Sequence, residues 1–173
     1  VIFPFKLYKG SKYWIPPIIN QEMNNFNKDL NPNLQDSKVE LFLAYQDKNV
    51  VGRIAVIINW FEVKKQKTSK IRFGWFDFID NYEVSDILFK KVIEIGKANH
   101  LEYMEGPMGF SNLDKVGVLT SGFDVIGTMI TNYNYDYYKN HYEKYGLKIE
   151  KTFHEKTFMF NDIDTGYYEK MSR

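Results

Sequence analysis

The alternation of hydrophobic and polar positions predicts three strands in the first half of the chain. Residues 39–46 and 50–59 are rich in β-branched and aromatic side chains and flank a short polar turn, which is typical of an antiparallel hairpin. Residues 70–79 form a third apolar run of strand length, with aromatic side chains on both of its faces. We expect these three runs to lie in one sheet.

Three other segments have the marks of helices. Residues 17–30 begin at a proline suited to a first helical turn and stop at an Asn-Pro-Asn sequence. A second helix is predicted after residue 79, and a third over 136–147, where Gly146 is suited to end it. The apolar face of the first is Ile19, Met23, Phe26 and Leu30, and that of the second is Val84, Ile87, Leu88, Val92 and Ile95. These spacings predict amphipathic helices that pack on the sheet.

Two further strands complete the predicted order. Residues 101–107 form a short strand that ends at a Gly-Pro pair, and residues 148–160 form a closing strand. Residues 60–69 are predicted to be a polar loop. Antiparallel strands followed by a β-α-β crossover predict an α/β (mixed α+β) fold, a central mixed sheet flanked by helices, in a single domain over 1–173.

The composition restricts the classes of function. The 173 residues suit one domain, and 44% hydrophobic residues are enough for a packed core. A net charge of +1 gives no electrostatic basis for binding nucleic acid or an anionic membrane. The absence of cysteine excludes disulfides and thiolate chemistry, and the three histidines are far apart, so no metal site is predicted. With no apolar run near ~20 residues and no signal-peptide pattern, we expect a cytoplasmic protein with a small-molecule partner.

The junction between the third strand and the next helix has an unusual charge. In α/β proteins the free N–H groups at such a helix start often bind phosphate. The junction FDFIDNYEVSDILF (76–89) has neither a glycine nor a basic residue at its start, and it carries Asp77, Asp80, Glu83 and Asp86. Asp80 followed by Glu83 predicts a variant of the capping box. Carboxylates at this terminus would repel a phosphate group.

The block HYEKYGL (141–147) resembles the fourth-helix signature of the GNAT (acyl-CoA N-acyltransferase) superfamily. Larger blocks, read together, resemble those of a largely uncharacterised bacterial GNAT-like family. They are LYKGSKYWIPP, LFLAYQDKNVVGRIAVIIN, FGWFDF, GPMGFSNLDKVGVLTSGFD and YNYDYYKNHYEKYGL. The resemblance covers most of the chain from Leu7 to Leu147 and implies a GNAT-like fold. Members of that family are often longer, so we expect this chain to be the N-terminal part of a longer protein.

The resemblance also implies an activity and roles for three residues. The activity is transfer of an acyl group from acetyl-CoA or another acyl-CoA to a small amine, which attacks the thioester directly. Tyr142 is implied as the acid that protonates the leaving thiolate, because a phenol with a pKa of about 10 is protonated at neutral pH. Asn134 and Tyr138 are implied as cofactor contacts. The residues themselves leave two alternatives open: Tyr142 packs the helix onto the sheet, and Asn134 caps the helix.

Two carboxylates are candidates for the base that activates the amine. Glu105 ends a strand at the place where, in the GNAT fold, parallel strands splay apart and the acyl group enters. Asp77 lies on the neighbouring strand. Arg53 interrupts an apolar strand and needs a partner, either Asp77 or Glu105 in an ion pair or an anionic ligand. Trp75 is a candidate for the wall of a substrate pocket or for the core.

Three hypotheses about function stay open. GNAT enzymes hold the CoA pyrophosphate with a Gln/Arg-x-x-Gly-x-Gly/Ala loop, and the junction described above lacks it. The chain is therefore an N-acyltransferase, or a GNAT-like binding or interaction domain that has lost CoA binding, or an acyltransferase whose donor is another carrier. A near-neutral charge disfavours a charged tRNA as that carrier. A homodimer is also left open.

Overall fold

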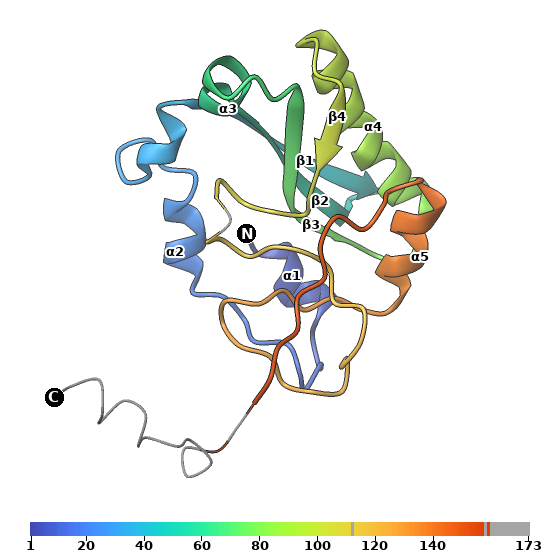
Figure 1. The fold of residues 1–173 in the computed structure, drawn as a ribbon. Coiled ribbons are helices and arrows are strands. Elements are labelled where there is room, and N and C mark those ends of the chain that lie inside the picture. Colours follow the sequence, from blue (N-terminus) through green and yellow to red (C-terminus); the bar gives the residue numbers. More distant parts are fainter. Residues whose placement is uncertain (112, 158, 160–173) are drawn as a thin grey trace, which may run out of the picture.

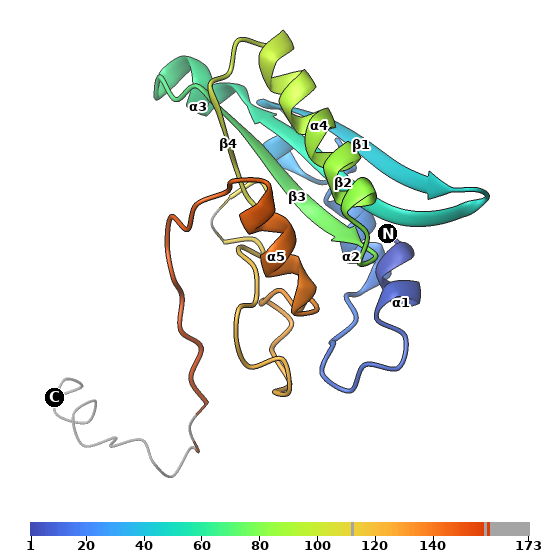
Figure 2. The same cartoon turned by 90° about the vertical axis from the view of Figure 1, so that its right-hand side faces the viewer.

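The fold is a small sheet with helices on both of its faces (Figures 1 and 2). The computed structural model describes residues 1–111, 113–157 and 159 of the chain. The strands are β1 (Ser37–Gln46), β2 (Asn49–Asn59), β3 (Lys70–Phe78) and β4 (Tyr103–Glu105). The helices are α1 (Phe3–Leu7), α2 (Ile19–Asn24), α3 (Trp60–Lys65), α4 (Tyr82–Ala98) and α5 (Tyr137–Lys144), with a 3-10 turn η1 (Pro32–Leu34).

The sheet is mixed, as the sequence predicts, and it is open. Its strands lie in the order β1-β2-β3-β4, in which the first two pairings are antiparallel and β3 pairs with β4 in parallel. Gln46 pairs with Asn49 across a two-residue turn, and Asp47 in that turn has a φ of 54°. Aspartate tolerates this left-handed conformation better than most residues. The predicted hairpin and the β-α-β crossover through α4 are both confirmed.

Helix α4 covers one face of the sheet and forms the main core with it. Val84, Leu88 and Val92 are buried in one cluster with the side chains of β2 that face the same way. Those side chains are Ile54, Val56 and Ile58. Burial of each such side chain contributes about 1.5–3 kcal/mol to stability. Ile87, which the spacing placed on this face, is exposed, because it lies outside the arc that the helix turns toward the sheet.

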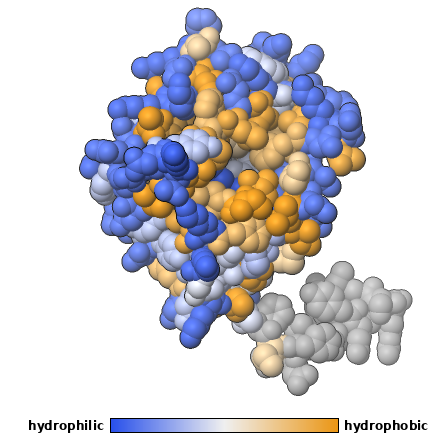
Figure 3. Space-filling model, turned by 180° about the vertical axis from the view of Figure 1, so that it is seen from behind, coloured by the Kyte–Doolittle hydropathy of each residue, from blue (hydrophilic) through white to orange (hydrophobic). Residues whose placement is uncertain are grey.

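Strand β1 forms the edge of the sheet beyond β2. Its outward side chains Leu41, Leu43 and Tyr45 are exposed. Figure 3 shows apolar side chains gathered on this side of the molecule. In the described part of the chain, no helix is both long and apolar enough to cross a lipid bilayer.

A β-bulge interrupts β3 where the strand approaches the site. Arg53 of β2 lies opposite Asp77, whereas Ala55 lies opposite Gly74, so β3 has one extra residue in this interval. Trp75 in the bulge has a φ of 45°. A bulge bends its strand and changes the direction of the side chains that follow.

The chain after β4 passes directly over β3 at Gly74. A Cβ atom added at Gly74 would lie 2.2 Å from the carbonyl oxygen of Met108, so this approach requires a glycine. Parallel pairing of β3 with β4 ends at Arg72 and Glu105, after which the N–H of Met108 donates to the carbonyl of Phe73 at 2.9 Å. Beyond that bond, no further backbone hydrogen bond joins β3 to the residues after Met108 in the described part of the chain.

The prediction of one long helix over 17–30 is wrong. The helix α2 covers only six residues, and the chain then turns repeatedly before η1. The segment is rich in asparagine, whose side chain competes for backbone groups and favours turns. Asn27 accepts a bond from the N–H of Asp29, and Asn31 accepts from the N–H of Asn33 and donates to the carbonyl of Asn25.

Two other predicted elements also differ. Residues 60–65 form α3 instead of a loop, because the side chain of Asn59 accepts bonds from the N–H groups of Phe61 and Glu62 and caps the helix. No strand forms over residues 148–157, which are exposed and pair with no described strand. The rest of that predicted strand includes residues 158 and 160, which lie outside the described residues. Helix α1 was not predicted.

The start of α4 is capped by Asn81, so the predicted capping box of Asp80 and Glu83 is wrong. The Asn81 side chain accepts a 2.9 Å bond from the N–H of Glu83. Asp80 instead contacts the ring of His141 on α5. Gly146 follows the end of α5 with a φ of 82°, as predicted for a residue that ends a helix.

Candidate functional site

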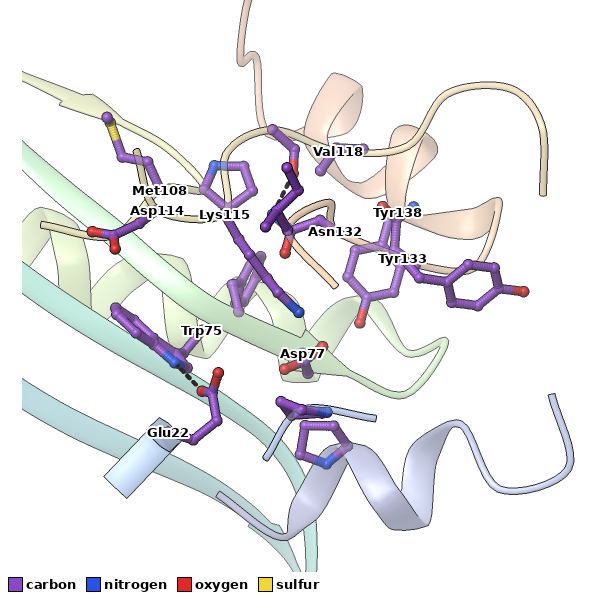
Figure 4. Close-up of a pocket in the computed structure, with 18 of the residues that line it drawn as sticks. Glu22, Trp75, Asp77, Met108, Asp114, Lys115, Val118, Asn132, Tyr133 and Tyr138 are labelled. Carbon is purple, nitrogen blue, oxygen red and sulfur yellow. Dashed lines mark hydrogen bonds between the residues drawn. The ribbon is translucent and has the colours of Figure 1, made fainter. Parts of the chain in front are cut away.

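A cavity of about 250 Å³ lies between the end of β3 and the loops after β4 (Figure 4). Its walls come from segments far apart in the sequence, namely α1 and α2, the end of β3, the loops after β4 and the start of α5. Six of the seven predicted site residues line it, and the exception is Glu105. The six are Arg53, Trp75, Asp77, Asn134, Tyr138 and Tyr142.

Asp77 and Arg53 form an ion pair on one wall of the cavity. The guanidinium Nε and Nη2 of Arg53 both lie 2.7 Å from Oδ2 of Asp77. The two side chains are only 13% and 14% exposed, so little water screens the pair. The structure thus contains the ion pair that the sequence predicted as one alternative for Arg53.

Two tyrosines extend this pair into the core. The hydroxyl of Tyr8 donates to Oδ1 of Asp77 at 3.0 Å, so it has no second proton to give. Tyr138 must therefore donate to Tyr8 across the 3.1 Å between their hydroxyls, and it accepts from the N–H of Phe78 at 3.2 Å. Burial, together with the Asp77 charge, raises the pKa of Tyr8 and Tyr138 well above its ordinary value. The bonds of Tyr138 make it a structural link between α5, α1 and β3.

Tyr142 differs from these tyrosines because its hydroxyl is free. The hydroxyl oxygen is buried and has no hydrogen-bond partner among the described residues. Its ring packs between Phe73, Phe76 and Phe89 and also lines the cavity. Burial, then the charge of Asp77, raises the pKa of the Tyr142 phenol well above its ordinary value. A buried polar group without a partner is costly, and Tyr142 is a residue of the cavity lining that carries such a group.

Asn134 holds a loop in place. Its side-chain oxygen accepts from the N–H of Leu119 at 2.7 Å, and its amide donates to the carbonyls of Leu119 and Tyr135. The residue that precedes α5 is Asp136, which makes no side-chain cap bond, so the helix-cap alternative for Asn134 is wrong. Because these bonds use both ends of the amide, Asn134 shapes the cavity wall.

Trp75 joins the bulge to the N-terminal segment. Its indole N–H donates to Oε2 of Glu22 at 2.6 Å, and its ring packs edge-on against Phe26 and Phe110. Glu22 also lines the cavity, so the bond places a carboxylate there that the sequence did not mark. Glu22 follows no motif, and only the tertiary fold brings it to β3.

Glu105 lies apart from the other candidates. Its carboxylate is 2.8 Å from Nζ of Lys70, in a network that also includes Glu62 and the buried Arg72. Arg72 donates further to the carbonyl of Phe110. This network fixes α3 and the loop after β4 on the sheet, outside the cavity.

Lys115 is the main cavity residue that sequence reasoning missed. It lies in the loop after β4, and its side chain extends into the cavity toward Asp77 (Figure 4). Burial lowers the pKa of Lys115, while Glu22 and Asp77 oppose this shift and Arg53 adds to it. An isolated lysine in a loop has no periodicity or motif, so no local signal could have identified it.

The start of α4 holds a compact cluster in place of a phosphate loop. His141 lies 2.7 Å from the hydroxyl of Ser85 through Nδ1 and 3.0 Å from Asp80 through Nε2, and it stacks on Tyr82. These three polar types also occur in hydrolytic triads, but Ser85 is buried and lines no part of the cavity. The cluster therefore docks α5 on α4. Among the described residues, no group of His, Asp and Glu side chains is placed to bind a metal ion.

The cavity opens beside exposed aliphatic side chains. Leu113, Met129 and Ile130 line it and are 90%, 53% and 77% exposed. Val125 and Ile126 of the same long loop are also exposed. Exposed apolar groups next to a cavity often mark a ligand-binding surface. We call Leu113, Met129 and Ile130 the apolar rim.

Comparison with known proteins finds two distant relatives. The chain is 26% identical to Protein YghO of Escherichia coli (strain K12) over 146 residues, which are 84% of the chain and 37% of that protein. It is 28% identical to the Bacterial ceramide synthase of Caulobacter vibrioides (strain NA1000 / CB15N) over 127 residues, which are 72% of the chain and 33% of that protein. The chain thus spans about a third of the length of these relatives. No protein-family model and no solved structure matches it.

Proposed function

We propose that the chain is a GNAT-like domain that transfers an acyl group from a thioester to an amine in the cavity. The observation that carries this proposal is the free, buried hydroxyl of Tyr142, a residue that lines the cavity between the end of β3 and the loops after β4. A hydroxyl that is shielded from water and has no partner is a preorganised hydrogen-bond donor for a bound ligand. Its raised pKa keeps it protonated at neutral pH, as a proton donor must be.

In the proposed reaction the amine attacks the thioester carbonyl, and Tyr142 donates to the sulfur that leaves. Burial disfavours the charged thiolate in the same way as the charged phenolate. The proton affinity of the leaving sulfur therefore rises together with that of Tyr142. Asp77 holds Arg53 and Tyr8, and through Tyr8 it orients Tyr138. We assign Asp77 to this positioning role because both of its oxygens already accept bonds.

We propose further that one substrate carries an aliphatic chain. The apolar rim supplies exposed surface on which such a chain would be removed from water, at about 0.8 kcal/mol per CH₂ group. The name of the Caulobacter relative points the same way, since a ceramide is the amide of a fatty acid and a long-chain amino alcohol.

A second candidate is a binding domain without acyl transfer. The asparagine-capped start of α4, with exposed Glu83 and with Asp80 against His141, favours it. Carboxylates at this terminus oppose a pyrophosphate. The first candidate consumes a thioester, and its acyl donor need not be CoA. The second candidate consumes no thioester.

The test uses octanoyl-CoA and the CoA-free thioester S-octanoyl-N-acetylcysteamine, with octylamine as acceptor and release of free thiol as the readout. We expect transfer from both donors, and weaker binding of acetyl-CoA than of octanoyl-CoA by calorimetry. Tyr142→Phe should lower kcat by about 10²-fold with little change in KM. The control is Tyr145→Phe, one turn away on the C-terminal side of α5 and outside the cavity lining. Binding without thiol release by the wild type would favour the binding domain.

A further inference from the structure

Lys115 lines the cavity, and the reaction proposed above assigns it no role. Lys115 forms no hydrogen bond or ion pair with the described residues. Its side chain extends from the loop after β4, and the terminal nitrogen points toward Asp77 at the end of β3 (Figure 4). The charged groups that face it are Glu22 from α2, Asp77 from β3 and Arg53 from β2. The carboxylate of Asp77 is paired with Arg53 and forms no ion pair with Lys115.

An amine substrate arrives as an ammonium ion and must lose a proton before it attacks. Asp77 is a poor acceptor because its oxygens take three bonds from Arg53 and Tyr8. Glu105 lies outside the cavity lining and is paired with Lys70. Glu22 remains, but its carboxylate already accepts the indole N–H of Trp75 at 2.6 Å. A base is most effective when its pKa is near the working pH.

We propose that the neutral amine of Lys115 is the general base that removes this proton. The assignment rests on the proposed acyl transfer. Lys115 takes one proton from the substrate ammonium, and the free amine then forms the C–N bond while the C–S bond breaks. The second N–H proton passes through Tyr142 to the departing sulfur, which leaves as a thiol. Lys115 returns its proton to solvent, so the net products are an amide, a thiol and one proton.

Two observations support Lys115 in this role. The side chain reaches the cavity that also contains Tyr142, so an amine could lie between the proton acceptor and the proton donor. Burial lowers the pKa of Lys115, which increases the neutral fraction at a given pH. The carboxylates of Glu22 and Asp77 oppose this lowering of the pKa, and the guanidinium of Arg53 adds to it.

The first experiment measures the proton affinity of Lys115 without any acyl acceptor. The folded protein is labelled with a trace of acetic anhydride between pH 6 and 11, with Nα-acetyl-lysine amide as internal standard. Mass spectrometry of the Lys115 peptide should show half-maximal labelling at a lower pH than the standard. In Glu22→Gln the midpoint should fall further, because a carboxylate that favours the ammonium is removed. A midpoint at or above that of the standard overturns the proposal.

The second experiment separates a base from a fixed charge. Lys115→Arg keeps a cation that does not deprotonate, and Lys115→Met removes it. In the S-octanoyl-N-acetylcysteamine assay both variants should lose about 10²-fold in kcat/KM at neutral pH. The acidic limb of the pH profile should move up toward the pKa of the alkylammonium substrate, about 10, because only amine that is already neutral can then react. The exposed Lys28→Arg is the matched control, and melting curves confirm that each variant folds.

The outcomes distinguish this proposal from the proposed function. If Lys115→Arg keeps wild-type activity, Lys115 acts through its charge and the proposal is wrong. If Glu22→Gln moves the acidic limb toward the pKa of the substrate ammonium and Lys115→Met leaves the limb in place, the base is Glu22. If the wild type transfers no acyl group although the Lys115 labelling midpoint is lowered, the proposed function fails and the base role fails with it, while the lowered pKa stands.

Discussion

At the scale of single residues, the site depends on which polar groups are already satisfied. Asp77 accepts bonds on both oxygens, Asn134 uses both ends of its amide, and Tyr138 both accepts and donates. Tyr142 and Lys115 have no such partners in the described part of the chain. The groups with free bonding capacity are therefore the ones to which we assign chemistry.

The ion pair of Asp77 and Arg53 should contribute to stability as well as to the site. Asp77→Asn leaves a guanidinium in a poorly hydrated wall without its counter-charge, which should lower the free energy of unfolding by about 2–3 kcal/mol. Urea denaturation measures this. Asp86→Asn is the control, because its pair with Lys90 is exposed and its loss should have little effect. If the two substitutions lowered the free energy of unfolding equally, the buried ion pair would stabilise the fold no more than the exposed one.

At the scale of elements, the junction of β3 and α4 shows a helix cap that lies one residue away from its predicted position. The sequence correctly places a helix start without a phosphate loop there. It assigns the cap to Asp80, whereas the structure assigns it to Asn81 and leaves Asp80 for His141. Both side chains can cap a helix, so the choice depends on where α5 docks.

This assignment of the cap can be measured in α4. Asn81→Ala removes the acceptor for the N–H of Glu83 and should lower the free energy of unfolding by about 1 kcal/mol. Asn81→Asp keeps an acceptor and should retain most of the wild-type stability. Urea denaturation of the two variants gives the comparison. Asp80→Ala is expected to act through His141 alone, and if it reproduces the loss while Asn81→Ala is silent, the cap is Asp80 after all.

At the scale of the whole molecule, aromatic packing joins segments from both ends of the described chain. Tyr8 of the N-terminal segment packs against Trp14, Tyr133 and Tyr135, and α5 packs on β3 through Phe78. Several of the tyrosine hydroxyls concerned are buried, and Tyr8, Tyr137, Tyr138 and Tyr142 have pKa values raised chiefly by burial.

The raised tyrosine pKa values predict alkaline unfolding. Each buried phenol stays protonated when folded and ionises near pH 10 when unfolded, so its stabilisation is complete below about pH 10 and is lost as pH rises toward the folded-state pKa. For Tyr8, Tyr138 and Tyr142 together the slope approaches about 4 kcal/mol per pH unit. Urea denaturation between pH 8 and 11.5 should show this, with tyrosinate absorbance at 295 nm rising in step with unfolding. A single titration of all 13 tyrosines without loss of structure would contradict it.

The sequence alone determines the hairpin, the third strand, the helix that crosses over it and the mixed sheet, because hydrophobic periodicity and turn chemistry act over a few residues. It also identifies six residues of the cavity wall. Only the tertiary structure decides that Lys115 and Glu22 join them, that Glu105 does not, and that Tyr142 has a free hydroxyl. Those facts depend on contacts between segments far apart in the chain, made by a bulge in β3 and a loop that crosses Gly74, for which neither spacing nor propensity carries a signal.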